Sequence, residues 1–494
     1  MTAIGASVSP PVLRNAIWLI GAQVLAAPLS VLINAFAGRY LGPADFGVLY
    51  LATTYSAFAL LFVEWGQFGT LTGKIATHRS RAGELLGSAM LWRLVAGAMA
   101  AACVLILCVI AGYGRSFLVV MALMMVATGL GSVAAAAQDA VRGFERTDFA
   151  ALTYLGGQLL LAAVSIAVLW LGYGLRGLVM GQIMCAAVGM AFVLYMLPRL
   201  NIRRLSFRPD IIVELVRDGR AFLFLALIVQ LQPLVDGAMM SHFANADAIG
   251  WYAASRKLLG VLIFPAAAVG SALYPSLVRQ FSVGDLAGCR TTVHGALRAL
   301  CLVVFPLAIC CALFPQVGVM IFNAKKFAPA EENLRVLALW LFLLYISIPL
   351  SQCINASGRQ VRWAAVQFGC VIISAVADPP LIDWFQAHSG NGGLGVCVAS
   401  VISEMLMVTG AVLLVPKGVL NAALLRLLGK PALAGAVMAG IGFLVGRYNT
   451  AAGAIVALAS YAAVLWLSGE LRGERLRSLR VSLRPGAAGS NAAP

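Results

Sequence analysis

The 494 residues of this chain are 61% hydrophobic and only 11% charged, with a mean hydropathy of +0.93. Soluble domains carry about 25% charged residues, and a soluble core cannot bury this much apolar surface. The composition therefore excludes a soluble protein and predicts one that crosses a lipid bilayer many times. The net charge of +16 does not require nucleic acid as a partner, because membrane topology accounts for it.

The first apolar run, 16–37, is too long for the apolar region of a cleaved signal peptide, and we expect it to remain as a membrane anchor. The segment RYLGPADFG (39–47) separates it from the next apolar run, 47–70. Gly42, Pro43 and Asp45 are turn-forming residues: Gly tolerates positive φ, Pro fixes φ, and Asp bonds to nearby backbone. The two runs are therefore predicted to form a tight helical hairpin.

Apolar runs of about 18 residues or more predict transmembrane helices along the whole chain. They fall at 16–37, 47–70, 85–111, 116–140, 151–173, 177–197, 218–243, 248–277, 294–322, 333–356, 361–385, 394–415, 430–446 and 451–468. The expected fold is an all-α polytopic membrane protein with about 14 transmembrane helices. An even number of helices places both termini on the same side.

The distribution of Lys and Arg predicts which side that is. With cytoplasmic termini, 25 of the 35 Lys and Arg residues lie in cytoplasmic ends and loops, as the positive-inside rule requires. Seven lie in the opposite loops: Arg39, Arg115, Arg176, Lys325, Lys326, Arg335 and Arg447. We therefore predict cytoplasmic termini and a disordered basic tail at 470–494, with contact to anionic lipid headgroups as a secondary role of that tail.

Two pairs of similar segments indicate an internal repeat. PADFGVLYLA (43–52) resembles NADAIGWYAA (245–254), and QDAVRGFERTDFAA (138–151) resembles QCINASGRQVRWAA (352–365). Each offset spans six predicted helices, an even number, so the halves share one orientation and form parallel repeats.

The predicted domains follow from this repeat. They are an N-lobe at 1–205, a C-lobe at 206–416, an appended helix pair at 417–469 and the tail at 470–494. Two facing lobes of this kind are expected to work by alternating access, with the substrate path between them near the midplane.

Seven ionisable residues lie within the predicted helices, where each costs about 2.5–3.5 kcal/mol on insertion scales. Seven such residues are too many to be exposed to lipid by accident, and they favour a water-filled cleft between the helices. They are Glu64, Arg93, Asp139, Asp236, Arg256, Lys257 and Glu404.

Structural alternatives stay open for several of them. Arg93 could extend to its helix end, Asp139 could cap its helix against Arg142, and Glu404 could form an ion pair within its own lobe. Asp236 is equally consistent with a counter-ion for the cations of the next helix and with a ligand of a coupling ion.

Cysteine and histidine give no sign of a special site. Nine of the ten cysteines lie inside apolar runs, no CxxC pair occurs, and the four histidines are scattered. Cysteine in this setting is a small apolar side chain. We predict neither a metal site nor a disulfide framework.

Four segments make the sequence similar to the polysaccharide-transporter branch of the multidrug/oligosaccharidyl-lipid/polysaccharide (MOP) exporter superfamily, the O-antigen-type flippases (Wzx type). The segments are RYLGPADFGVLYLA (39–52), QDAVRGFERTDFAAL (138–152), the stretch 234–277 that ends in LYPSL, and the stretch 321–359. Family assignment rests mainly on the first of these, since the others are degenerate.

The resemblance implies a flippase that moves undecaprenyl-diphosphate-linked oligosaccharide across the bacterial inner membrane. The product would serve O-antigen, other lipopolysaccharide, capsule or exopolysaccharide synthesis. Expected partners are the polyprenyl-diphosphate glycan, membrane lipids, and a polysaccharide polymerase or co-polymerase, with no nucleic acid. No cofactor is implied, and a coupling ion, H⁺ or Na⁺, is left open.

The resemblance also assigns roles. Related lipid II flippases have a functional arginine on helix 8, and Arg256 matches it when LYPSL is aligned on Pro275. Arg256, Lys257 and Arg93 are thus candidate diphosphate contacts. Candidate cavity acids or ion-coupling residues are Glu64, Asp236, Asp139 and Glu404, and the candidate periplasmic gate is Arg39 with Asp45.

Other functions compete with this one. An ion-coupled multidrug exporter of the MATE type is the nearest alternative, and lipid II is an alternative cargo. The resemblance to lipid II flippases implies arginines on the first helix, and the run 16–37 contains no Lys or Arg. This absence counts against lipid II as the cargo.

A polymerase, ligase or glycosyltransferase needs an acidic pair or a His/Arg site in a large external loop. The predicted external loops are short, so we expect no enzyme. A scaffold for polysaccharide synthesis would leave the charged cleft unexplained.

Overall fold

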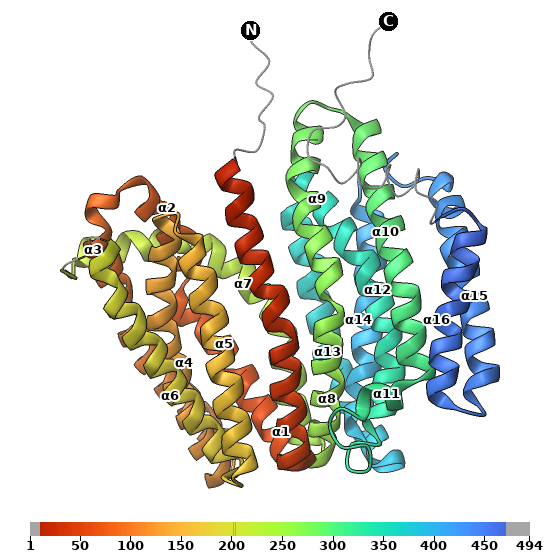
Figure 1. Ribbon diagram of the computed structural model, residues 1–494, viewed down its shortest axis with the longest axis horizontal. Coiled ribbons are helices and arrows are strands. Elements are labelled where there is room, and N and C mark those ends of the chain that lie inside the picture. The colour runs from red at the N-terminus through yellow and green to blue at the C-terminus, as the bar shows by residue number, and fades with distance from the viewer. Residues whose placement is uncertain (1–9, 201, 203, 471–494) are drawn as a thin grey trace, which may run out of the picture. The chain divides into compact units, whose positions relative to one another are not determined.

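The computed structural model describes residues 10–200, 202 and 204–470, and every regular element within this part of the chain is a helix. Figure 1 shows the elements in chain order. Contacts divide the chain into two compact units, Met1–Ser241 and His242–Pro494. The predicted tail lies outside the described residues except for Glu470. The boundary between the two lobes at 205/206 was predicted from the internal repeat, and it stays a prediction.

The first unit is built from seven helices. They are α1 (Pro10–Glu64), α2 (Gln67–Thr77), α3 (Ala82–Ile110), α4 (Arg115–Gly143), α5 (Thr147–Trp170), α6 (Gly174–Met196) and α7 (Pro209–Phe243), whose last two residues fall in the second unit. Two short 3₁₀ turns, η1 (Arg79–Arg81) and η2 (Leu197–Leu200), follow α2 and α6.

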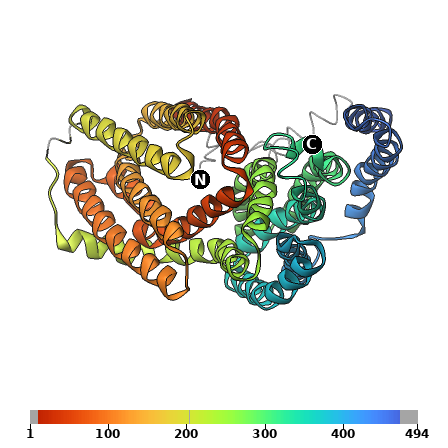
Figure 2. The same cartoon turned by 90° about the horizontal axis from the view of Figure 1, so that it is seen from below.

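Nine helices lie in the part of the second unit that the structure describes. They are α8 (Ala246–Leu262), α9 (Phe264–Ser282), α10 (Leu286–Leu313), α11 (Pro315–Val319), α12 (Ala330–Ala356), α13 (Gln360–Ser389), α14 (Gly392–Leu414), α15 (Ala422–Gly446) and α16 (Thr450–Leu467). Within this unit α12 packs against α9, α10 and α14, and α15 pairs with α16. Figure 2 shows the same helices end-on.

The predicted first hairpin is present at Gly42. Its φ of 79° and ψ of 175° interrupt the helical conformation of α1, a backbone state that only glycine adopts without strain. An unbroken run of 57 residues, Gly21–Thr77, would be about 85 Å long at 1.5 Å per residue. That is more than twice the hydrocarbon thickness of about 30 Å, so this run must cross twice. In Figure 1 the red ribbon changes direction at the lower end of α1.

The number of candidate spans agrees with the prediction. Within the described residues, 11 helices are long and apolar enough to cross a membrane, or 13 when two bent pairs are each counted as one span. The bends are 57° between Pro209–Phe224 and Ala226–Phe243, and 45° between α8 and α9. Pro265, at the start of α9, removes a backbone donor there and accounts for the second bend. Counting Gly21–Thr77 as two spans gives the expected 14.

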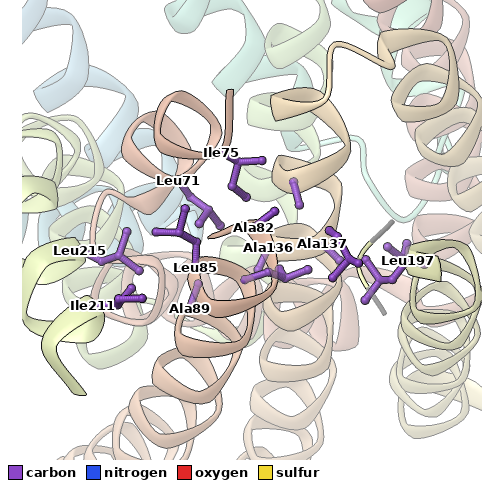
Figure 3. Packing of buried hydrophobic residues seen from close by; sticks show 14 residues of the cluster. Leu71, Ile75, Ala82, Leu85, Ala89, Ala136, Ala137, Leu197, Ile211 and Leu215 are labelled. Atoms are coloured by element: carbon purple, nitrogen blue, oxygen red, sulfur yellow. The ribbon is translucent and has the colours of Figure 1, made fainter. Parts of the chain in front are cut away.

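A buried apolar cluster joins α2, α3, α4 and the first half of α7 (Figure 3). It includes Leu71, Leu85, Ala136 and Leu215, each less than 5% exposed. Two further clusters lie in the second unit, one centred on α9, α10, α12 and α14, the other on α10, α15 and α16. Each unit therefore has its own core.

The end of α1 is joined to α7 by close backbone contact. Trp65 and Gly66 have positive φ values of 46° and 69°, which separate α1 from α2. A Cβ added to Gly66 would lie 2.2 Å from the carbonyl oxygen of Gly219, and Trp65 Nε1 donates to the carbonyl of Val216 at 3.0 Å. Lys74 on α2 pairs with α7 as well, with its Nζ 2.7 Å from Asp218 Oδ2. The first half of α7 is thereby fixed to α2.

Candidate functional site

In the first unit, two predicted site residues, Asp139 and Glu64, lie near a third, Arg93. Its side chain on α3 is fully buried and donates from Nε to Gln67 Oε1 (3.1 Å), from Nη1 to the carbonyl of Ser132 (2.7 Å) and from Nη2 to Asp139 Oδ2 (3.2 Å). The side chain therefore stays inside the unit and does not extend to a helix end. It connects α2, α3 and α4.

The charges around Arg93 balance. Asp139 on α4 also lies 3.6 Å from Arg142 Nη1, one turn along the same helix, so the predicted pairing with Arg142 is present beside the pairing with Arg93. Glu64, at the end of α1, lies near enough to Arg93 for their charges to interact. Two cations thus face two acids. The role of Arg93 in diphosphate binding stays a prediction, because its three nitrogens already donate to protein acceptors.

Asp236 lies on the second half of α7 and is 1% exposed. The neighbouring Gly237 faces the second leg of α1, since an added Cβ would be 3.4 Å from Leu51. One turn further, Ser241 Oγ accepts from Tyr113 at 2.5 Å, and the Tyr113 hydroxyl lies 2.5 Å from that of Tyr55. A polar cluster therefore surrounds this part of α7. The predicted pairing of Asp236 with the cations of α8 stays a prediction.

In the second unit, Arg256 on α8 lies against aromatic rings. Its guanidinium carbon is 4.5 Å from the ring centroid of Trp340 on α12 and 6.0 Å from that of Tyr252 on α8. At such distances a cation is attracted by the face of the ring. Tyr345 on α12 donates to the carbonyl of Leu262 at 2.5 Å and joins the end of α8 to the same helix. The guanidinium of Arg256 therefore lies beside aromatic rings where α8 packs against α12.

Glu404 on α14 supplies the opposite charge. It is 1% exposed, accepts a hydrogen bond from Ser347 Oγ at 2.5 Å and is near enough to interact with the charge of Arg256. The predicted ion pair of Glu404 within its own lobe stays a prediction. Lys257, next to Arg256, is half-buried. Arg256 and Glu404 place a planar cation and a buried acid where α8, α12 and α14 meet.

This arrangement suits binding of a phosphorylated group. A guanidinium presents several N–H donors in one plane and binds phosphate oxygens in pairs, and charge-assisted hydrogen bonds of this kind are the strong ones. The Trp340 ring lies against the Arg256 guanidinium, and Glu404 brings a carboxyl group of opposite charge near it. We call Arg256, Trp340, Ser347 and Glu404 the α8–α12–α14 site.

One buried acid escaped the sequence analysis. Asp378 on α13 is fully buried and lies inside the predicted helix 361–385, just before Pro379 and Pro380. An acid followed by two prolines within an apolar run is a visible signal. Its neighbour Ser374, one turn earlier, is 1% exposed, so α13 turns a polar face inward at this point.

The predicted periplasmic gate residues flank the α1 turn. Arg39 and Asp45 are both exposed on either side of Gly42. Their exposed position fits a surface role, and their role as a periplasmic gate stays a prediction.

Comparison with known families gives two matches. A model described as "Polysaccharide biosynthesis protein" matches residues 12–281, and a model described as MatE matches residues 222–379. A curated relative from Methanocaldococcus jannaschii, the uncharacterized membrane protein MJ1068, is 22% identical over 369 residues. That alignment covers 69% of this chain and 73% of the relative.

Solved structures share the fold over most of the chain. The lipid II flippase MurJ in an inward closed conformation superposes with a TM-score of 0.68 at 12% identity, covering 92% of this chain and 99% of MurJ. An inward-facing multidrug-resistance MATE transporter of the MOP superfamily gives 0.65 at 14% identity, covering 83% and 99%. A MOP superfamily transporter from Pyrococcus furiosus gives 0.51 at 14% identity, covering 85% and 96%. At these identities the likeness establishes the fold.

Proposed function

Because this chain belongs to the polysaccharide biosynthesis protein family of MOP-superfamily transporters, we propose that it is a flippase for undecaprenyl-diphosphate-linked oligosaccharides. It moves these lipids from the inner to the outer leaflet of a bacterial inner membrane by alternating access. The product feeds surface polysaccharide synthesis, where a polymerase or co-polymerase is the next partner. Both termini are cytoplasmic in this proposal, and no cofactor takes part. The coupling ion, H⁺ or Na⁺, is left open.

The observation that carries the proposal is the position of Arg256 against Trp340 and near Glu404. A lipid-linked glycan brings a diphosphate and several sugars into a region where hydrocarbon would strip their hydration. An oriented guanidinium replaces part of that hydration through charge-assisted hydrogen bonds. Lys257 adds positive charge on the next residue, while the polyprenyl tail stays in lipid.

Lipid II is a less favoured cargo. The first apolar run, 16–37, contains no Lys or Arg, so this chain lacks the helix-1 cations that the resemblance would lead one to expect for lipid II. An ion-coupled multidrug exporter is the second candidate, because the MatE model matches residues 222–379. That match includes α8, which carries Arg256.

The test is deletion of the gene in its host, followed by extraction of polyprenyl-diphosphate lipids and profiling of surface glycans. We expect a lipid-linked oligosaccharide to accumulate and surface polysaccharide to be lost. Wild type should restore both, and Arg256→Ala should not. The matched control is Arg447→Ala, which removes an arginine stacked 4.3 Å from the ring of Phe443 at the end of α15, outside the α8–α12–α14 site.

The possible results separate the function from the site. Normal lipid-linked glycans together with increased drug sensitivity would show an exporter. Accumulation of lipid II in the deletion strain would show the other cargo. If the expected oligosaccharide accumulates but Arg256→Ala complements as well as Arg447→Ala, the flippase function holds and the diphosphate site lies elsewhere. Membrane levels of each variant, measured by immunoblot, exclude loss of expression.

A further inference from the structure

A pocket opens in the first unit where α4 ends, α5 begins and α6 ends. None of its lining residues belongs to the α8–α12–α14 site, and the lining combines apolar side chains with two arginines. The lining residues are Gln138, Val141, Arg146, Phe149, Ala150, Thr153, Phe192, Val193, Met196 and Arg199. Half of them come from the segment QDAVRGFERTDFAAL (138–152), which the proposed transport function leaves without a role.

The pocket lies at the level of the lipid headgroups. The 24 residues of α5, Thr147–Trp170, span about 36 Å, slightly more than the hydrocarbon thickness of about 30 Å. Trp170 and Tyr173 mark the far end and are 74% and 67% exposed, as interfacial aromatic residues are. The pocket is at the near end, beside Arg146. A molecule bound in the pocket would therefore lie where lipid headgroups meet acyl chains.

The two arginines are presented over aromatic rings. The guanidinium carbon of Arg146 is 4.5 Å from the ring centroid of Phe149, and that of Arg199 is 5.2 Å from that of Tyr195. Arg146 also lies 3.4 Å from Asp148. Arg199 forms no ion pair with any residue that the structure describes, and its Nη2 is 3.4 Å from the Tyr195 hydroxyl. The rim thus carries more positive than negative charge.

The walls below this rim are apolar. Val193 and Ala150 are 3% and 2% exposed, and Phe192 is 46% exposed with its ring accessible along the outside of α6. Val141 and Met196 complete this surface. A small anion such as inorganic phosphate would satisfy the arginines and leave these walls uncovered. An amphipathic anion satisfies both.

We propose that this pocket is a binding site for an anionic phospholipid. The phosphate lies between Arg146 and Arg199, and the first part of one acyl chain follows Phe192, Val193 and Met196. Basic pockets between transmembrane helices bind anionic headgroups in this manner. A zwitterionic lipid brings its own cation to the two arginines and is disfavoured. The site gives the 138–152 segment a role in lipid binding that is independent of the transported substrate.

The test is a titration of the purified, delipidated full chain with dioleoyl phosphatidylglycerol, followed by native mass spectrometry. The same titration with dioleoyl phosphatidylcholine changes only the headgroup charge. We expect wild type to retain one phosphatidylglycerol more tightly than phosphatidylcholine. The variant Arg146→Ala/Arg199→Ala should bind phosphatidylglycerol about thirtyfold more weakly, because each interfacial arginine contributes about 1 kcal/mol.

The matched control is Arg279→Ala/Arg362→Ala. Both residues are exposed, both lie in loops or helix ends predicted to be on the same side of the membrane, and the pair removes the same charge. It should bind phosphatidylglycerol within about twofold of wild type, since neither residue lines the pocket. A third variant, Thr153→Phe, fills the pocket without a change of charge and should also weaken binding. Its thermal unfolding, compared with wild type, shows whether the fold persists.

Four results would overturn the proposal. Equal losses in the pocket and control variants would show only general surface charge. Equal affinity for the two lipids would remove the headgroup selectivity. Complete displacement of phosphatidylglycerol by soluble glycerol phosphate would show a site for the anion alone. Displacement by an undecaprenyl diphosphate at far lower concentration would show a binding site for the transported class of lipid.

Discussion

Arg93 on α3 and Asp139 on α4 form an ion pair with almost no access to solvent. Arg93 Nη2 lies 3.2 Å from Asp139 Oδ2, and the two side chains are 0% and 7% exposed. Removing one partner of such a pair leaves a charge that neither water nor protein neutralises fully. Replacing both partners by apolar side chains leaves no charge behind. The two kinds of substitution therefore have different consequences.

We expect Asp139→Ala to lower the free energy of unfolding by about 3–5 kcal/mol, measured by thermal or denaturant unfolding in detergent. The double variant Arg93→Leu/Asp139→Leu should be less destabilised than this single variant. The control is Glu145→Ala, which breaks an exposed pair with Arg79 and should cost at most about 1 kcal/mol. Equal losses for Asp139→Ala and Glu145→Ala would show that the buried pair contributes nothing special.

A second prediction concerns the contact between α2 and α7. Gly66 has a φ of 69°, and a Cβ there would lie 2.2 Å from the Gly219 carbonyl oxygen. Gly66→Ala should therefore destabilise the protein by about 2 kcal/mol or more, because left-handed strain and steric conflict add. Gly73→Ala, on the same helix, meets nothing within 4 Å and should stabilise by about 0.5–1 kcal/mol. Unfolding midpoints of the two variants that shift in the same direction would contradict this account.

Hydropathy and turn residues were sufficient to predict most of this fold. Apolar runs give the spans, and Gly42 with Pro43 gives the first turn, because a bilayer leaves few alternatives to apolar helices of fixed length. The boundaries were less accurate where helices continue past charged residues. α7 begins at Pro209, not at 218, and α15 begins at Ala422, not at 430. The helix predicted at 361–385 continues to Ser389 in α13.

The ionisable residues were identified by type, but apart from the Asp139–Arg142 pairing their partners in the structure were not predicted. Arg93 and Asp139 are 46 positions apart, and Ser347 and Glu404 are 57 apart. Such pairs depend on how helices pack, and no local pattern encodes that packing. Asp378 was not among the predicted site residues, although the two prolines after it mark its position.

A third prediction concerns the aromatic partner of Arg256. Trp340→Leu removes the ring that lies 4.5 Å from the guanidinium, and a cation–π contact of this kind contributes about 0.5–2 kcal/mol. We therefore expect complementation of the deletion strain to fall by about two- to thirtyfold, as measured by the accumulated lipid-linked oligosaccharide. Trp340→Phe should retain more activity than Trp340→Leu.

The control for this prediction is Trp466→Leu, at an exposed tryptophan of α16 that is 64% accessible. It removes the same ring from a lipid-facing position and should complement fully. Arg256→Lys should lie between wild type and Arg256→Ala, because lysine keeps the charge and loses the planar fork. Full complementation by Trp340→Leu would mean that the ring does not orient Arg256 for transport.

The last prediction separates the two interactions of Glu404. Its carboxylate accepts from Ser347 Oγ at 2.5 Å and faces the charge of Arg256. Ser347→Ala removes only the hydrogen bond, so it should lower the free energy of unfolding by about 1.5–3 kcal/mol, as for other bonds to charged groups. Glu404→Gln keeps an acceptor for Ser347 and removes the negative charge. It should therefore affect transport more than stability.

We expect the Glu404→Gln strain to accumulate lipid-linked oligosaccharide as the Arg256→Ala strain does, while its protein unfolds close to the wild-type temperature. The Ser347→Ala strain should show the opposite pattern, with lower stability and retained transport. The reason is that only the charge of Glu404 competes with an incoming diphosphate for Arg256. If both variants lose stability and both transport normally, Glu404 serves packing alone, and the anion site must be sought at other cations of the second unit.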